Sequence, residues 1–215
     1  MKFIISLGGS LIVPNEVDIK FLKELKALLT KSRHEFVLVC GGGKTARNYI
    51  NAAKEFRISD TNIDLIGMKA TELNATLVAK ILGCKTANNL REIRINKDKF
   101  IIGYGYFPGM TTDADSVMAA GLIKADVVIN LSNVKGVYNK DPGKYKDAKM
   151  YKKMNYDELI TLAEKEVLGL GANFIFDLKA CRLAKKEGIK LIFIKGLGNL
   201  RKVINGKRFI GTVIE

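Results

Sequence analysis

The chain has 215 residues, of which 47% are apolar and 27% charged, and its formal net charge is +14. This length predicts a single domain with a substantial core. No apolar run reaches the roughly 18–20 residues that a membrane-spanning helix needs, which excludes a transmembrane protein of the helical kind. The start MKFIISLGGSL also lacks the long apolar stretch and the cleavage site of a signal peptide, so we expect a cytoplasmic protein.

The positive net charge admits a nucleic-acid partner. However, the lysines are interleaved with acidic residues, as in DIKFLKELKALLTKSR, and this pattern is typical of a solvated helix face. The chain also lacks aromatic residues interleaved with a basic patch and any recognisable nucleic-acid-binding motif. A nucleic-acid-binding regulator is therefore the less favoured alternative.

The positions of the cysteines and the histidine limit the metal sites that the chain could form. Cys40, Cys84 and Cys181 lie far apart in apolar surroundings, without a C-x-x-C, and His34 is the sole histidine. We therefore expect buried, reduced thiols and no metal site built from protein side chains.

Strands and helices alternate along the first half of the chain. Asp18 is expected to cap a first helix, a second helix follows the GGG triplet as far as Ala53, and a third spans residues 65–82. Continuous apolar runs predict strands buried on both faces at residues 2–7, 36–40 and 100–105. The apolar helix faces are predicted to carry Ile19, Leu22, Leu25, Leu28 and Leu29 in the first helix, and Leu73, Leu77 and Ile81 in the third.

The second half continues the alternation. The sequence TTDADS predicts a helix start with Thr112 or Asp113 as the N-cap residue. A strand at residues 126–131 and a polar loop follow. Two helices at 156–168 and 176–187 and the strands IKLIFI and RFIGTVI complete the chain. This order predicts an α/β protein with a mostly parallel sheet and helices on both faces.

Four predicted strands end in polar or glycine-rich loops. These loops are GGS after the first strand, GGGK after the second, GYGYFPGMTTD after the third and LSNVKGVYNKDP after the fourth. Ligands of an open α/β sheet collect at the carboxyl ends of its strands, so we expect the loops to converge on one edge. Two glycine turns at that edge suit a ligand with several phosphates, or two phosphorylated ligands.

The sequence CGGGKT resembles the end of a Walker P-loop but does not complete it. The Walker pattern needs a glycine five residues before Gly43, where Leu38 stands in mid-strand. A phosphate-binding turn of another kind and a plain strand-to-helix turn both remain open from these residues alone. Lys44 and Arg47 follow the turn closely enough to reach a phosphate, and the alternative for each is an exposed helix residue.

Together, SLGGSL, GGGKTARNYI, PGMTTDADSVMAA and LSNVKGVYNKDP resemble the amino-acid-kinase superfamily, and more closely its archaeal uridylate (UMP) kinases. The resemblance implies a three-layer α/β/α sandwich with a mostly parallel central sheet. Residues 1–125 would bind the acceptor and residues 126–215 would bind ATP. It implies transfer of the γ-phosphoryl group of Mg·ATP to UMP, with Mg²⁺ as cofactor, ATP and UMP as small-molecule partners, and a homo-oligomer that is hexameric by analogy.

The same resemblance assigns roles to individual residues. The ATP-binding residues would be Gly9, Ser10, Gly43, Arg47, Ser132, Tyr138 and Asp141. The UMP-binding residues would be Gly42, Asp64, Tyr106, Phe107, Pro108, Gly109, Met110, Thr111 and Thr112.

The catalytic candidates are Lys44 and Asp113, and the first of them follows from a departure from the family pattern. Many superfamily members carry a lysine two residues before the first glycine pair, where this chain has Ser6. Lys44 is then the candidate for the catalytic cation. A superfamily kinase acting on isopentenyl phosphate or on a carboxylate is the alternative enzyme; the former uses an acceptor-site histidine, and His34 precedes the second strand, away from the predicted ligand edge.

Overall fold

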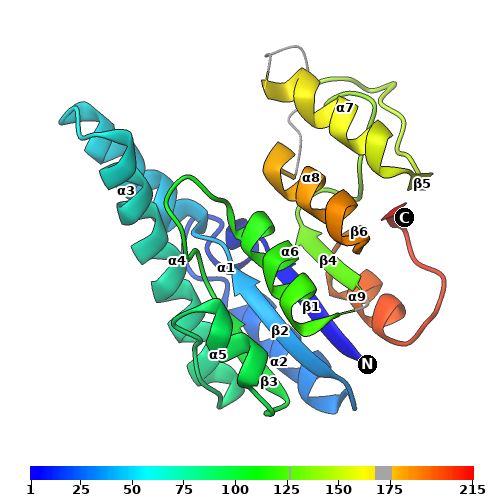
Figure 1. The fold of residues 1–215 in the computed structure, drawn as a ribbon, viewed down its shortest axis with the longest axis horizontal. Coiled ribbons are helices and arrows are strands. Elements are labelled where there is room, and N and C mark those ends of the chain that lie inside the picture. Colours follow the sequence, from blue (N-terminus) through cyan, green and yellow to red (C-terminus); the bar gives the residue numbers. More distant parts are fainter. Residues whose placement is uncertain (126, 168–175) are drawn as a thin grey trace.

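The computed structural model describes residues 1–125, 127–167 and 176–215. Asp126 and Leu168, the ends of two predicted elements, lie outside these ranges. Within them, one seven-stranded sheet has the order β3-β2-β1-β4-β6-β7-β5 (Figure 1). The strands are β1 Lys2–Leu7, β2 Glu35–Cys40, β3 Phe100–Gly103, β4 Val127–Ser132, β5 Lys153–Met154, β6 Lys190–Lys195 and β7 Gly211–Ile214.

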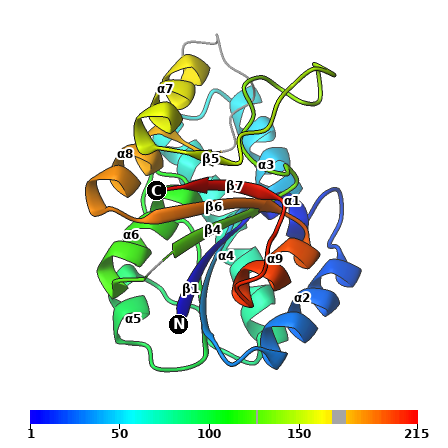
Figure 2. The ribbon, with the colours of Figure 1, turned by 90° about the vertical axis from the view of Figure 1, so that its right-hand side faces the viewer.

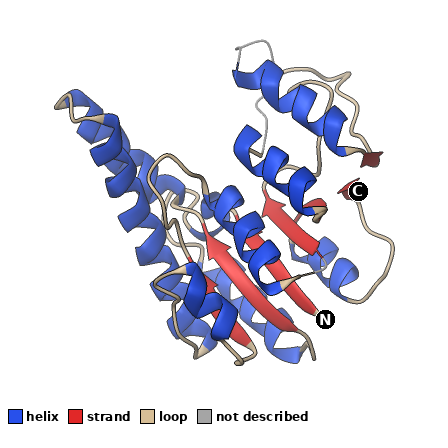
Figure 3. Cartoon of the chain, viewed as in Figure 1, coloured by secondary structure: helices blue, strands red, loops and turns tan. Residues whose placement is uncertain are grey.

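Helices cover both faces of this sheet, which confirms the three-layer prediction (Figures 2 and 3). One core lies between the sheet and α2, α4 and α9, and the other between the sheet and α5, α6, α7 and α8. The helices are α1 Gly9–Ile12, α2 Ile19–Lys31, α3 Gly43–Glu55, α4 Asp60–Leu82, α5 Leu90–Ile95, α6 Thr112–Ile123, α7 Tyr156–Val167, α8 Leu178–Glu187 and α9 Leu197–Ile204. None of the helices in the described ranges combines the length and apolar character needed to cross a bilayer.

The strands pair in parallel except for β6 and β7, which are antiparallel. As predicted from their continuous apolar runs, β1, β2 and β3 are buried on both faces. Phe3, Phe36 and Phe100 occupy matching positions on these three neighbours, and their rings stack at centroid distances of 5.9 and 6.0 Å. This ladder helps to fix the register of the strands whose loops matter below.

Several predicted details hold and others are wrong. Asp18 caps α2 by accepting the Phe21 N–H, as expected. Ile19 and Leu73 were expected on buried faces but are 63% and 62% exposed. The N-cap of α6 is Thr111, whose hydroxyl accepts the Ala114 N–H, rather than Thr112 or Asp113. The short elements α1, α5, α9 and β5 were not predicted, because each is too short to show a period.

The turns after β1 and β2 touch each other through their backbones. We call residues 8–10 the first glycine turn and residues 41–43 the second. A Cβ on Gly9 would lie 2.1 Å from the Gly43 nitrogen and 2.6 Å from the Gly41 carbonyl oxygen. Gly43 also has a φ of +62°, in the region that favours glycine. The triplets are therefore required by the close approach of the two turns, whatever they bind.

We predict that Gly9→Ala destabilises the protein by at least about 2–3 kcal/mol, because its methyl group would overlap backbone atoms that cannot move independently. For a chain of this size the melting temperature should fall by roughly 5–10 °C. The matched control is Gly198→Ala in α9, where a Cβ meets open space and φ is ordinary. That change should be neutral or stabilising by up to ~1 kcal/mol. Equal melting temperatures for the two variants in thermal denaturation would contradict the steric argument.

Candidate active site

The ligand edge predicted from the sequence exists. The strands β3, β2, β1 and β4 are neighbours and run in parallel, so their carboxyl ends share one edge of the sheet (Figure 1). The first glycine turn lies between its neighbours: Gly41 N–H donates to the Leu7 carbonyl at 3.0 Å, and Gly8 N–H donates to the Leu131 carbonyl at 3.0 Å. Three loops distant in sequence are thus held together by backbone hydrogen bonds.

Side chains add to this arrangement on both sides. The buried side-chain amide of Asn74, on α4, donates to the Gly41 carbonyl at 2.8 Å and so binds the second glycine turn to α4. On the other side, the Ser10 hydroxyl accepts a hydrogen bond from the Asn133 amide at 3.1 Å. Ser132, at the end of β4, accepts the Val134 N–H and shapes the loop that follows. Ser10 and Ser132 therefore lie on adjoining loops.

Helix α3 begins at the second glycine turn, with Gly42 as its N-cap and Gly43 as its first residue. Lys44 and Arg47 lie in its first two turns. Lys44 is half-buried and Arg47 is exposed, and neither forms an ion pair or a side-chain hydrogen bond within the described part of the chain. The first backbone N–H groups of a helix have no partner within the helix and can bind an anion. One of those in α3 is already used, because the Lys44 N–H donates to the Val13 carbonyl. The remaining positive charge near the turn is therefore mainly that of the two side chains.

Asp113 is the centre of a polar cluster between α6, β1 and β4. Its Oδ1 accepts hydrogen bonds from the Ser6 hydroxyl at 2.6 Å and from the Asn130 amide at 3.0 Å. Burial raises the pKa of Asp113 to about 7, while these two hydrogen bonds act in the opposite direction. Ser6, which stands at the position of the missing lysine, thus holds a carboxyl group instead of carrying a charge.

Two further acids lie around this cluster. Asp115 is fully buried, and its Oδ2 accepts the Tyr106 N–H at 3.3 Å, whereas its Oδ1 has no partner within the described residues. Burial raises the pKa of Asp115 to about 7. Asp177 caps α8 and also accepts the hydroxyl hydrogen of Thr111, and its charge contributes to both raised pKa values. The charge of Asp177 therefore acts on both neighbouring carboxyl groups.

The loop of residues 106–112 is held at several backbone positions. Thr71 accepts the Gly105 N–H just before the loop at 3.0 Å, and Asp64 accepts the Gly109 N–H at 2.7 Å. The hydroxyl of Tyr106 donates to the Ala87 carbonyl, so the tyrosine ring is packed against the protein. The half-exposed Phe107 belongs to the tip of the loop. Asp64 and this loop, both predicted to bind the acceptor, do meet in space.

The polar loop after β4 runs back across the sheet. Tyr138 pairs with Met150, and the neighbouring Val137 N–H donates to the Thr212 hydroxyl at 2.8 Å. Asp141 closes its own turn by accepting the Gly143 N–H. The structure thus places Tyr138 and Asp141 on the side of β7 and β5, on the half of the sheet away from the second glycine turn.

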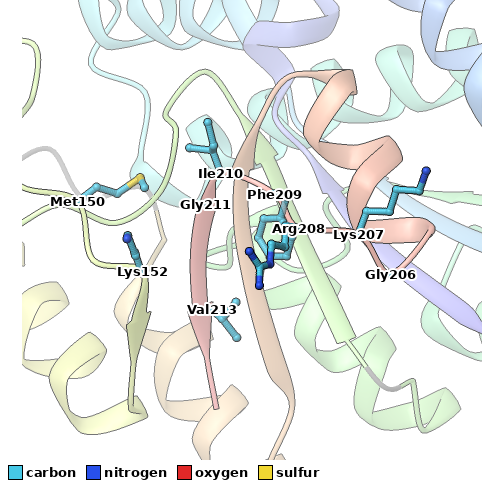
Figure 4. A pocket seen from close by; sticks show the side chains of 9 residues that line it. All are labelled: Met150, Lys152, Gly206, Lys207, Arg208, Phe209, Ile210, Gly211 and Val213. Carbon is cyan, nitrogen blue, oxygen red and sulfur yellow. The ribbon is translucent and has the colours of Figure 1, made fainter.

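A cavity of about 630 Å³ lies elsewhere, beside β7 and the segment that follows α9 (Figure 4). It is lined by Met150, Lys152, Gly206, Lys207, Arg208, Phe209, Ile210, Gly211 and Val213. None of the predicted site residues is among them. The candidate site is therefore defined by the converging loops and not by this hollow.

Within the described ranges, no group of three or more histidine, cysteine, aspartate or glutamate side chains is arranged to hold a metal ion. Mg²⁺ keeps several waters and is commonly bound through substrate phosphates with one or two carboxylates.

A parallel sheet with two interlocked glycine turns and cationic side chains at its carboxyl edge defines a phosphate-handling α/β protein. Residues 1–195 match the model of the amino acid kinase family, and the chain belongs to that family. It is 35% identical to the uridylate kinase of Thermoplasma volcanium, over the whole chain and 97% of that protein. It is 36% identical to the uridylate kinase of Methanocaldococcus jannaschii over the full length of both.

Solved structures agree with the fold. The crystal structure of uridylate kinase from Archaeoglobus fulgidus superposes with a TM-score of 0.85 at 34% identity, and each chain is covered completely. The UMP kinase structure from Bacillus anthracis has a TM-score of 0.83 at 23% identity and supports the fold alone. The family, the fold class and the resemblance stated from the motifs are thereby confirmed.

The sequence analysis did not identify the buried polar residues that form hydrogen bonds to the loops and side chains of the site. Asn74 and Asn130 lie on elements predicted from their apolar residues, where a polar residue was the available signal. Asp115 lies in the predicted polar helix start, where one more acid gave no sign of burial. The role of Asp177 had no such signal, because its partner Thr111 is 66 residues away.

We predict that Asp115→Asn stabilises the protein at neutral and higher pH. The folded-state pKa of Asp115, about 7, lies above its ordinary value, so the folded protein retains a proton that the unfolded chain releases. Stability from this group is complete at low pH and is lost as pH rises from about 4 to 7. The amide stays neutral and its oxygen can still accept the Tyr106 N–H.

The gain in melting temperature over wild type should therefore be largest near pH 8 and should shrink toward pH 4. Thermal denaturation of both proteins across this range provides the measurement. A difference that does not change with pH would mean that Asp115 is ionised in the folded state.

Proposed function

We propose that this protein catalyses reversible phosphorylation of UMP to UDP with Mg·ATP, a step of pyrimidine nucleotide biosynthesis. The observation that carries the proposal is full-length similarity, at 35–36% identity, to proteins named uridylate kinase. The geometry supports it, because the Asp64 side chain and the 106–112 loop meet on one side of the glycine turns. The adjoining loops after β1 and β4 lie on the other side.

In the proposed reaction, an oxygen of the UMP phosphate forms a bond to the γ-phosphorus of ATP. The bond between that phosphorus and the β,γ-bridging oxygen breaks, and ADP leaves with the electron pair. Such a transfer needs alignment of two anions and neutralisation of their charge, and it does not need a nucleophilic side chain. The sole histidine fits this chemistry: His34 packs against Phe3, at the amino ends of the strands and away from the site.

We assign the residues as follows. Gly42, Asp64 and the 106–112 loop bind UMP, with Asp64 contacting the ribose hydroxyls. Gly9, Ser10, Gly43, Arg47, Ser132, Tyr138 and Asp141 bind ATP. Mg²⁺, bound to the ATP phosphates, would supply charge neutralisation, and Asp113 is the carboxyl group placed to contact it or to orient its water. Lys44 is assigned to the transferring phosphoryl group.

We also propose that the protein acts in the cytoplasm as a homo-oligomer. The exposed side chains of Tyr49, Phe56 and Leu73 lie on α3 and α4. A shallow apolar hollow of about 330 Å³ between these helices is lined by Thr45, Tyr49, Ile66, Lys69, Ala70 and Leu73. A second copy of the chain would bury this face, and exposed apolar surface of this kind often marks an interface.

We predict that UMP is the preferred acceptor. A panel of UMP, AMP, isopentenyl phosphate and acetylglutamate with Mg·ATP, followed by ADP release, tests this directly. The kcat/KM for UMP should exceed those of the other acceptors, because each lacks the uridine that Asp64 and the 106–112 loop would contact. Faster turnover of any of the other three would replace the assignment with another kinase of the family.

We predict that Lys44→Met lowers kcat by about a hundredfold, since loss of an electrostatic contact at a reacting group costs ~2.7–4 kcal/mol. The KM for UMP should be nearly unchanged, because the contact acts mainly in the transition state. The control is Lys54→Met, an exposed lysine in the last turn of the same helix. A raised KM with an unchanged kcat would show that Lys44 only binds ground-state phosphate.

A further inference from the structure

Two phosphate-bearing substrates would bring a large negative charge to the candidate site. Asp113, Asp115 and Asp177 lie around the edge where these substrates would meet. None of these acids forms an ion pair with a lysine or arginine in the described ranges. Ser6 provides no charge, and Lys44 and Arg47 both lie on α3, on one side of the site. A cation is missing on the opposite side, where α8 begins.

Lys179 occupies that position. It lies in the first turn of α8, and its Nζ donates to the Gly109 carbonyl at 2.7 Å, at the tip of the 106–112 loop. The N–H of the same glycine is bound by Asp64 from α4. Two residues earlier, Asp177 accepts the Thr111 hydroxyl hydrogen. The start of α8 therefore contacts the loop at two points, through the carboxylate of Asp177 and the ammonium group of Lys179.

The placement of this lysine is unfavourable for the helix itself. A positive charge in the first turn opposes the helix macrodipole, and α8 has no acidic residue in its first turn to compensate. Lys179 is exposed and has no carboxylate partner within the described residues. Its single partner is a neutral carbonyl oxygen, which binds an ammonium group more weakly than a phosphate does. The N-cap Asp177 supplies negative charge at this helix start and offsets part of the cost. What marks Lys179 as a candidate for function is its exposed ammonium group on the 106–112 loop, held by a neutral carbonyl oxygen alone among the described residues.

We propose that Lys179 is a further catalytic residue of the phosphoryl transfer, whose ammonium group leaves the Gly109 carbonyl and contacts the phosphoryl group as it passes from ATP to the acceptor. The proposal rests on the proposed function. It assigns one cation to each side of the reacting group, with Lys44 on α3 and Lys179 on α8. Because the first turn of α8 belongs to the half of the chain that would bind ATP while Gly109 belongs to the acceptor half, the residue responds to both substrates.

Two substitutions separate the charge of Lys179 from its hydrogen bond. Lys179→Gln removes the charge and keeps a donor for the Gly109 carbonyl, whereas Lys179→Arg keeps the charge. If the charge acts in the transition state, Gln should lower kcat about tenfold or more with a smaller effect on either KM. Arg should recover most of the lost kcat, to within about threefold of wild type, since its head group differs in shape.

The matched control is Lys186→Gln. Lys186 lies on the same helix, is exposed and forms no ion pair among the described residues, so the loss of one positive charge there should leave kcat unchanged. Melting temperatures of all variants, measured without substrates, show whether α8 remains folded. A lower kcat in Lys179→Gln at an unchanged melting temperature supports the proposal.

Other results overturn it. Wild-type kcat in Lys179→Gln would mean that the charge is not used. Equal losses in the Gln and Arg variants, or a raised KM for UMP with unchanged kcat, would mean that Lys179 only fastens the 106–112 loop. Failure of the proposed function is distinct, because it appears in the wild type as absence of UMP phosphorylation. The same variants would then be compared with the acceptor that the panel identifies, and an enzyme with no acceptor would remove both proposals.

Discussion

The contact between the two glycine turns is the constraint on which the rest of the site depends. Gly9 lies so close to Gly41 and Gly43 that no side chain can stand between them. This approach brings the loop after β1 against the loop after β2, while the Gly8 N–H binds the end of β4. Three strand ends are fixed within one small region before any ligand is present, and preorganisation of this kind lowers the entropic cost of aligning two substrates.

The hydrogen-bonded cluster around Asp113 is built from residues on the same strands, β1 and β4. Ser6 lies one residue before the end of β1 and Asn130 lies near the end of β4, so both donors come from the strands that carry the loops. A buried carboxyl group with a raised pKa is the result. A serine at position 6 leaves β1 without a charged side chain at the end that carries the first glycine turn.

Much of the fold followed from periodicity and composition. Unbroken apolar runs predicted that β1 and β2 are buried on both faces. A polar residue just before an apolar helix face predicted that Asp18 caps α2. The prediction that Ile19 and Leu73 are buried was wrong, because the spacing of apolar residues alone does not show which part of a helix packs on the sheet. The glycine turns were recognised as phosphate-binding candidates, but their contact with each other depends on strand order, which no local pattern encodes.

The polar contacts of the site were beyond sequence reasoning for a related reason. Ser6 and Asp113 are 107 residues apart, and Lys179 and Gly109 are 70 apart, so each pair is created only when the sheet is assembled. Residues of this kind join parts of the chain that serve different substrates. Here α8 comes from the half assigned to ATP and the 106–112 loop from the half assigned to the acceptor, and hydrogen bonds from Asp177 and Lys179 connect them. These two hydrogen bonds join the two halves of the chain directly at the loop, through contacts that exist only in the assembled sheet.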